Sequence, residues 1–161
     1  MTLSTKTIAS PVGELTLVAS GTGIVAILWE NDSPDRVKLD ATTEDAGHPV
    51  LEAAEAQLRE YFDGARTAFD LPLDFRGTDF QKSVWAELLA IPFGETRSYG
   101  EIAEKLGRPK AARAVGAANG RNPISIVAPC HRVIGSTGKL TGFAGGLAAK
   151  EYLLTLESRA A

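Results

Sequence analysis

The chain of 161 residues has a single cysteine, Cys130, and only two histidines, His48 and His131. One thiol excludes an internal disulfide, and one thiol with two imidazoles is too few for a cysteine-rich zinc site. We therefore expect a reducing compartment and no structural metal. No basic segment followed by an apolar run opens the sequence, and no apolar run approaches the roughly 18 residues that span a bilayer. These absences predict a cytoplasmic protein.

Charge is distributed unevenly along the chain, whose formal net charge is −3. Residues 1–75 carry five basic and thirteen acidic side chains, a net charge of −8, whereas residues 76–161 carry twelve and seven, a net charge of +5. Between residues 97 and 139, eight basic residues stand against only Glu101 and Glu104. Such an excess is suited to neutralising phosphate groups, although a solvated basic surface without a ligand has the same composition.

Residues 1–76 have the pattern of a small α/β domain. Apolar runs between turn residues predict four strands, at residues 5–9, 14–19, 23–29 and 71–75. An acidic loop is expected from residue 30 to 47, where apolar periodicity is weak. The apolar spacing over Pro49–Phe62 predicts a helix with proline in its first turn. We expect His48 to be an exposed loop residue.

Residues 77–161 have a mostly helical pattern. Thr78 and Gln81 are spaced as a capping box, which predicts a helix with five apolar residues facing a core: Phe80, Val84, Trp85, Leu88 and Leu89. Ser98 and Glu101 form a second capping box before another helix. After a short turn containing glycine, a third helix is expected over residues 110–119, and this order is typical of a helix-turn-helix motif.

The third of these helices has mostly small side chains: Ala111, Ala112, Ala114, Gly116, Ala117 and Ala118. Arg113 is the one long side chain inside this run, and the set that reads base edges in the major groove is missing. Short side chains let a helix approach a minor groove about 6 Å wide, where binding is nearly independent of sequence. We therefore predict binding to double-stranded DNA, with Arg113 projecting into the duplex. Close packing in a core is the alternative, which explains the alanines but not the arginine.

Cys130 lies in an apolar segment, directly after Pro129 and directly before His131 and Arg132. Imidazole and guanidinium neighbours lower the pKa of a thiol, so Cys130 is a candidate nucleophile. A lone cysteine is also often a small buried apolar residue. A nucleophile close to a DNA-binding helix predicts an enzyme that acts on a base, which must leave the stack to reach the thiol.

Three motifs in this order resemble the O6-alkylguanine-DNA alkyltransferase family: Asn122-Pro123, Pro129-Cys130-His131-Arg132-Val133 and Gly142-Phe143-Ala144-Gly145-Gly146. The resemblance covers residues 78–157, and the N-terminal part agrees in size and layout. It implies a ribonuclease-H-like α/β domain followed by a mostly α domain with a winged helix-turn-helix. It also implies direct-reversal repair, in which an alkyl group moves irreversibly from O6 of guanine to a cysteine. Each molecule then acts once, on a base flipped from the minor groove, without cofactor or metal.

The same resemblance assigns roles to individual residues. Cys130 becomes the alkyl acceptor, and His131 relays its proton through a water molecule, since adjacent residues of an extended segment point to opposite sides. Glu157 polarises the imidazole, Asn122 braces the active-site turn, and Tyr99 rotates the nucleotide and helps to protonate the departing guanine. The implied DNA contacts are Ser98, Tyr99, Ala111, Ala112, Arg113, Gly116 and Ser136. The implied walls of the substrate pocket are Pro129, Val133, Phe143 and Ala144.

Other interpretations of these residues stay open. Without the resemblance, Tyr99 suits a core, Asn122 a simple turn and Glu157 an exposed helix end. Phe143 replaces a tyrosine that is often found there, and Ala144 replaces a serine or glycine. The metal-binding cysteines of some relatives are absent, which favours the stand-alone, constitutive type. A monomer in solution is expected, and cooperative binding on DNA is open.

Three other classes share part of this pattern. A cysteine hydrolase would use Cys130, His131 and a carboxylate, but it needs an oxyanion hole for which the sequence gives no sign. A thiol-based transcription regulator would read sequence through polar side chains, which the alanine-rich helix lacks. Alkyltransferase-like proteins that only bind lesions carry tryptophan in place of the cysteine.

Overall fold

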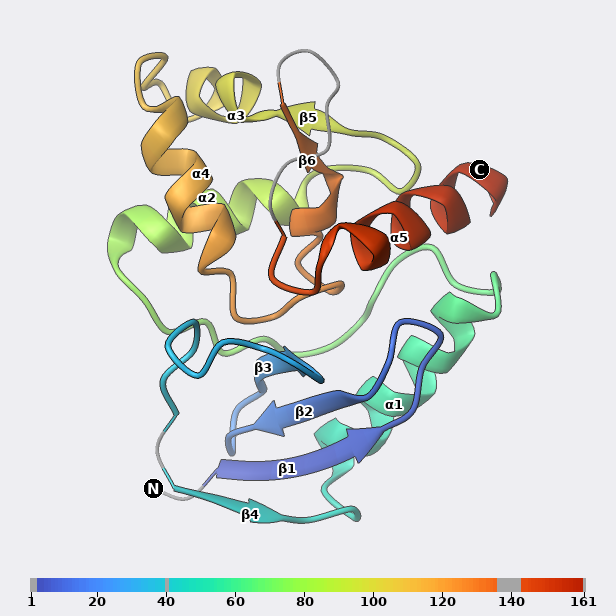
Figure 1. Cartoon of the computed structure of the whole chain (residues 1–161). Coiled ribbons are helices and arrows are strands. Elements are labelled where there is room, and N and C mark those ends of the chain that lie inside the picture. The colour runs from blue at the N-terminus through green and yellow to red at the C-terminus, as the bar shows by residue number, and fades with distance from the viewer. Residues whose placement is uncertain (1–2, 40, 136–142, 161) are drawn as a thin grey trace.

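The computed structural model describes residues 3–39, 41–135 and 143–160, which form two domains stacked one above the other (Figure 1). The N-terminal domain has a four-stranded sheet in the order β3-β2-β1-β4, with one helix, α1, packed on it. Its elements are β1 (Leu3–Ile8), β2 (Leu15–Ala19), β3 (Ile24–Trp29), β4 (Thr42–Glu44) and α1 (Pro49–Phe62). The pairs β1·β2 and β2·β3 are antiparallel, whereas β4 is parallel to β1. The first three predicted strands and the helix are confirmed.

Three expectations for this domain are wrong. The predicted loop 30–47 contains the edge strand β4, whose three exposed residues have no apolar pattern to reveal them. The predicted strand 71–75 forms only an isolated bridge between Ile24 and Leu73, because Pro72 has no N–H to extend the ladder. His48 is a half-buried N-cap of α1, since its Nδ1 accepts a hydrogen bond from the Val50 N–H at 3.2 Å.

The C-terminal domain is built mainly from helices. Its elements are α2 (Asp79–Leu89), β5 (Arg97–Ser98), α3 (Tyr99–Lys105), α4 (Ala112–Gly120), η1 (Cys130–Arg132), β6 (Val133–Ile134) and α5 (Leu147–Ala160). Both predicted capping boxes are present, so the starts of α2 and α3 are set locally. Val84, Trp85 and Leu88 are buried as expected, but Leu89 is 45% exposed because it lies on the solvent side of α2. Within the described ranges, no helix combines the length and apolar composition needed to cross a bilayer.

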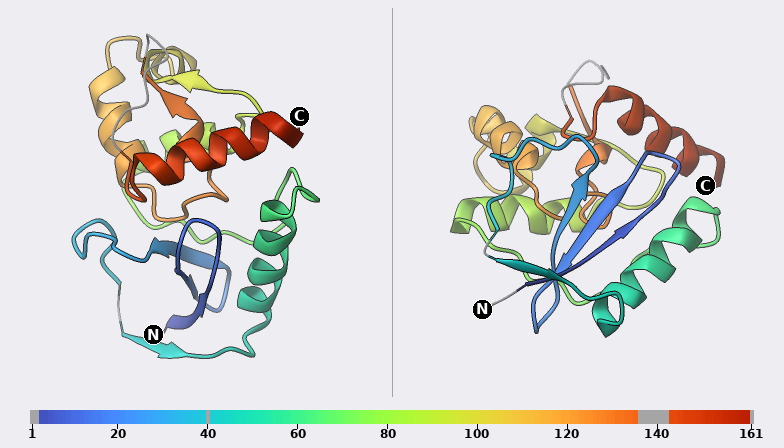
Figure 2. Two further views of the ribbon diagram at one scale, coloured as in Figure 1. Left: turned by 45° about the vertical axis from the view of Figure 1, so that its right-hand side comes forward. Right: turned by 60° about the horizontal axis from the view of Figure 1, so that its bottom comes forward.

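The two domains share one apolar core. The segment that follows α4 runs along the edge strand β3, where Ile27 and Ile124 form a parallel bridge and the Ile27 N–H donates to the Pro123 carbonyl at 2.9 Å. Ile124 and Ile126 lie in the same buried cluster as the inner face of the sheet and α1. In two further views, α5 lies on the side of the C-terminal domain that faces the N-terminal domain (Figure 2). The sheet therefore supports the segment that leads to Cys130.

Candidate active site

Cys130 begins a single 3-10 turn, η1, between Pro129 and β6. The turn is closed by hydrogen bonds from the Arg132 N–H to the Pro129 carbonyl and from the Val133 N–H to the Cys130 carbonyl. The expectation of an extended segment at Cys130 and His131 is therefore wrong. On a 3-10 turn, successive side chains are about 120° apart and do not point to opposite sides. Cys130 is 4% exposed, so the thiol lies inside the protein.

Asn122 braces the loop that leads to this turn. Its buried side chain donates from Nδ2 to the Ala128 carbonyl at 2.8 Å and accepts at Oδ1 from the Ile124 N–H at 3.1 Å. Within this loop Ile126 has a φ of +73°, a left-handed conformation that is rare for a β-branched residue. The two hydrogen bonds of the Asn122 side chain thus close a loop whose backbone conformation is unfavourable on its own.

The thiol is held in its neutral form. Burial raises the pKa of Cys130, and a side-chain hydrogen bond with Asn122 lowers it only in part. This differs from the expectation that a neighbouring imidazole and guanidinium lower the pKa of the thiol, because burial outweighs all the groups that lower it. The thiol therefore needs a base before it can attack an electrophile.

His131, the residue after Cys130, forms a buried pair with Glu157 of α5. The His131 Nε2 lies 2.7 Å from the Glu157 Oε2, and neither residue is more than 1% exposed. Burial lowers the pKa of His131 despite the raising effect of Glu157, so the imidazole is neutral. Although burial opposes it, hydrogen bonds from His131, Arg132 and Tyr61 lower the pKa of Glu157 to about 2. Since the carboxylate can only accept, Nε2 carries the proton and Nδ1 presents a lone pair.

That Nδ1 atom has no hydrogen-bond partner among the residues that the structure describes. A buried polar atom without a partner is rare, and in an active site it is a candidate for a chemical role. His131 Nδ1 is therefore available as a base.

Glu157 accepts hydrogen bonds from two further side chains. Arg132 donates from Nε to Oε1 at 2.8 Å and from Nη2 to Oε2 at 3.0 Å, and it also donates to the Ile91 carbonyl. The Tyr61 hydroxyl, at the end of α1, donates to Oε2 at 2.6 Å. Sequence reasoning missed Tyr61, because its spacing on the helix also fits a plain core position.

Lys150 is a second buried group that sequence reasoning missed. It is fully buried on α5, and its Nζ donates to the Val133 carbonyl at 2.7 Å and lies 5.9 Å from the centre of the Phe143 ring. Burial lowers its pKa. Its spacing from Leu153 and Glu157 is helical, so these three residues share one face of α5. This pattern could have revealed a buried lysine.

The expected pocket residues have different surroundings. Pro129 and Val133 are buried on either side of the 3-10 turn. Phe143 packs edge-on against Trp29 with ring centres 5.3 Å apart, whereas Ala144 is exposed. A Cβ at Gly145 would lie 2.6 Å from Trp29, so only glycine allows this approach.

Most of the expected DNA contacts lie on α3 and α4. Arg113 is exposed, and Gly116 faces the Tyr99 ring, since a Cβ at this glycine would lie 3.7 Å from Tyr99 Cδ1. Ser98 accepts from the Glu101 N–H as the N-cap of α3. Ala111 and Ala112 are half-buried at the start of α4, and Ser136 lies outside the described residues. Tyr99 also packs against the apolar cluster that contains Cys130, which connects this surface to the thiol.

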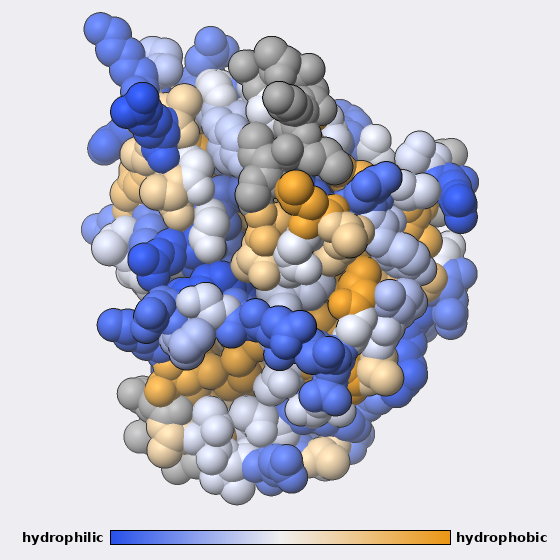
Figure 3. All heavy atoms as spheres, viewed as in Figure 1, coloured by the Kyte–Doolittle hydropathy of each residue, from blue (hydrophilic) through white to orange (hydrophobic). Residues whose placement is uncertain are grey.

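Hydrophilic side chains project from the corner of the molecule where α3 and α4 meet (Figure 3). The exposed basic residues of these two helices and of their connection are Lys105, Arg108, Lys110 and Arg113. This corner is therefore suited to a polyanion.

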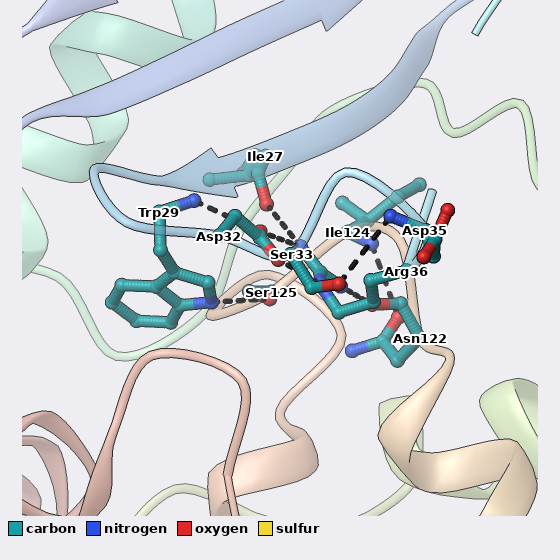
Figure 4. Close-up of polar contacts among 9 residues, drawn as sticks. All are labelled: Ile27, Trp29, Asp32, Ser33, Asp35, Arg36, Asn122, Ile124 and Ser125. Carbon is teal, nitrogen blue, oxygen red and sulfur yellow. Dashed lines mark hydrogen bonds and ion pairs between the residues drawn. The ribbon is translucent and has the colours of Figure 1, made fainter. Parts of the chain in front are cut away.

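A polar network holds the Asn122 loop from the N-terminal domain (Figure 4). Arg36 donates from Nη1 to the Asn122 carbonyl and from Nε to Asp32 Oδ1 at 2.7 Å. Trp29 donates from Nε1 to the Ser125 hydroxyl at 3.1 Å. Sequence reasoning placed these residues in a strand end and an acidic loop, so it missed their contact with the site.

Among the described residues, no three His, Cys, Asp or Glu side chains come together in a way that could hold a metal ion.

Comparisons with known proteins agree with this geometry. Residues 3–75 match the ribonuclease-like domain of 6-O-methylguanine DNA methyltransferase, and residues 79–159 match its DNA binding domain. Methylated-DNA--protein-cysteine methyltransferase of Mycobacterium tuberculosis is 53% identical over 154 residues, 94% of this chain and 90% of that relative. The protein of the same name from Methanosarcina acetivorans is 49% identical over 148 residues, 92% and 94% of the two chains.

Solved structures show the same fold. The crystal structure of Mycobacterium tuberculosis O6-methylguanine methyltransferase superposes with a TM-score of 0.88 at 52% identity, over 99% of this chain and 94% of that one. The crystal structure of Mycobacterium tuberculosis OGT in complex with DNA gives 0.89 at 50% identity, over 100% and 95%. The chain therefore belongs to the 6-O-methylguanine DNA methyltransferase family.

Proposed function

We propose that this protein repairs DNA by moving the alkyl group of O6-alkylguanine onto Sγ of its own Cys130. The observation that carries the proposal is a buried, neutral thiol next in sequence to a neutral imidazole whose Nδ1 lacks a partner among the described residues. Family membership supplies the substrate class.

The atoms of the reaction balance without a cofactor. The thiol proton passes to His131 Nδ1 through a water molecule, as the resemblance implies, and Glu157 stabilises the imidazolium that forms. Sγ attacks the alkyl carbon, so the S–C bond forms while the bond from O6 to that carbon breaks. The departing guanine takes a proton, for which the resemblance nominates the Tyr99 hydroxyl; the imidazolium then releases the thiol proton to solvent, and solvent reprotonates Tyr99. The product is a stable thioether, so each molecule acts once.

The helix-turn-helix of α3 and α4 supports the DNA part of the proposal. Its small residues allow close approach to the minor groove, and Arg113 extends from the same helix into solvent. Because Cys130 is buried, a base can reach it only after leaving the stack. Arg113 then fills the space that the base leaves, and little sequence preference is expected.

Mass spectrometry with a duplex containing one O6-methylguanine tests this function. We expect one added methyl group on the Cys130 peptide and repair that stops at one lesion per protein molecule. Repair beyond that ratio would show an enzyme that turns over, such as a cysteine hydrolase. Tight lesion binding with no change in mass would show a lesion sensor.

A further inference from the structure

Tyr61 joins the N-terminal domain to the His131–Glu157 pair. It is 1% exposed, and its hydroxyl donates to the same carboxylate oxygen, Oε2, that faces His131 Nε2. Arg132 supplies a third donor to that oxygen and one to Oε1. Of the four hydrogen bonds that the described residues make to the carboxylate, three therefore come from His131 and Arg132, and the fourth crosses from the other domain.

The direction of the Tyr61 hydroxyl is fixed by aromatic packing. Its ring centre lies 5.3 Å from Phe62, 5.4 Å from Phe69 and 6.4 Å from Phe93. The Arg132 guanidinium lies over the same Phe93 ring, 5.7 Å from its centre. One aromatic cluster thus orients two of the donors to Glu157.

We propose that Tyr61 is a positioning residue for alkyl transfer, which holds the Glu157 carboxylate toward His131 and limits how strongly that carboxylate attracts a second proton to the imidazole. This role rests on the proposed function and gives the N-terminal domain a part in it. Tyr61 acts through Glu157 and His131, and its role involves no contact with the Cys130 thiol or with the alkylated guanine.

The physical reason is the sharing of one carboxylate oxygen among donors. Each donor neutralises part of the charge on Oε2, so removal of the Tyr61 hydroxyl leaves more negative charge facing the imidazole. A protonated His131 is then stabilised, and a protonated His131 cannot accept the thiol proton.

Other ionisable groups near this pair do not replace Tyr61. The cations Arg132 and Lys150 both disfavour a proton on His131, and Cys130 is neutral. The electrostatic effect of Tyr152 falls on Tyr61, whose pKa it raises. Burial, with the negative charge of Glu157, raises the pKa of Tyr61 above its ordinary value, so the hydroxyl stays a donor throughout the working range.

The test is the single-turnover rate of methyl transfer from an O6-methylguanine duplex, measured in the full chain over a pH range of about 5 to 9. In Tyr61→Phe we expect the acid limb of the profile, which lies below the ordinary histidine pKa of about 6.5, to move up by about half a unit, so that the rate on that limb falls by up to about threefold. The rate on the alkaline plateau changes less than about twofold. The matched control is Tyr152→Phe, which removes a hydroxyl from an exposed tyrosine of α5 and leaves the profile in place.

Two further measurements keep the result interpretable. Tyr61→3-fluorotyrosine keeps the shape of the ring and makes the hydroxyl a stronger donor, so the acid limb moves to lower pH. A nitrogen NMR titration of His131 without DNA reports the same two shifts and does not depend on the transfer reaction. An unmoved limb, or an equal loss of rate at every pH, would overturn the role of Tyr61. Absence of methyl transfer to Cys130 in the unaltered protein would instead overturn the proposed function, while the titration still tests Tyr61.

Discussion

Arg36 of the N-terminal domain donates a hydrogen bond to the backbone carbonyl of Asn122, whose own side chain closes the loop before Cys130. Tyr61 provides another polar link between the domains, to Glu157. The N-terminal domain therefore contacts both sides of the candidate site, first the loop that presents the thiol and then the carboxylate that orients the imidazole.

Asp32→Asn tests the first of these links. Asp32 fixes the Arg36 guanidinium through both carboxylate oxygens, and both side chains are less than 10% exposed. Loss of its charge leaves a nearly buried cation less well paired, so the free energy of unfolding should fall by about 2 kcal/mol. Urea denaturation measures this change. Asp35→Asn, at an exposed neighbouring position, should have no measurable effect, and an equal loss in both variants would contradict the role of the Arg36 pair.

Stability should fall as the pH drops below about 6.5, the ordinary pKa of histidine. His131 is buried neutral with a lowered pKa, so the unfolded chain binds a proton there before the folded protein does. Glu157 adds a second loss between about 4.5 and about 2, because its folded pKa is depressed to about 2. Each proton contributes a slope of up to about 1.4 kcal/mol per pH unit.

Urea denaturation at a series of pH values measures these slopes. In His131→Gln the part of the loss between about pH 5 and 6.5 should shrink, leaving the contribution of Glu157 at lower pH. An unchanged slope in that variant would show that His131 is not neutral in the folded protein.

Arg113→Ala should slow transfer on duplex DNA and leave transfer from the free modified base unchanged. Unstacking a base costs a few kcal/mol, so losing the side chain that offsets part of it lowers the duplex rate by about tenfold or more. Arg159→Ala, at an exposed arginine near the end of α5, is the matched control for the loss of one positive charge. Equal losses on duplex and free base would remove the role of Arg113 in base flipping.

Cys130→Ser should abolish methyl transfer and leave binding to the damaged duplex intact, since a hydroxyl is far less acidic than a thiol but has a similar size. Intact mass and a binding titration on the same sample separate the two effects. A variant that still accepted the methyl group would contradict the assignment of the nucleophile.

Local features of the sequence predicted much of the fold. The capping boxes at Thr78 and Ser98 are present because each depends on residues only three positions apart. β4 was missed because an exposed edge strand of polar residues has no apolar alternation, and Pro72 prevented a strand that the apolar pattern favoured.

The site was only partly predictable for a different reason. The motif around Cys130 predicted a nucleophile and a histidine, and the resemblance added Glu157, which the structure places against His131. The partners of these residues are distant in sequence, and nothing local distinguishes the tyrosine that binds Glu157 from a core tyrosine. Arg36 likewise lies in an acidic loop where an arginine is ordinary, and only the fold places it against Asn122.

The surroundings of Trp29 give the molecule an internal optical reporter. Its indole touches Gly145 and Phe143 from the segment before α5 and bonds to Ser125 beside the active-site loop, and it is 6% exposed. The other tryptophan, Trp85, is buried in the separate cluster between α2 and α4, so its replacement by phenylalanine leaves Trp29 as the single tryptophan, at the domain contact. The emission of that single indole then follows any loosening of the domain contact in real time, with no attached dye.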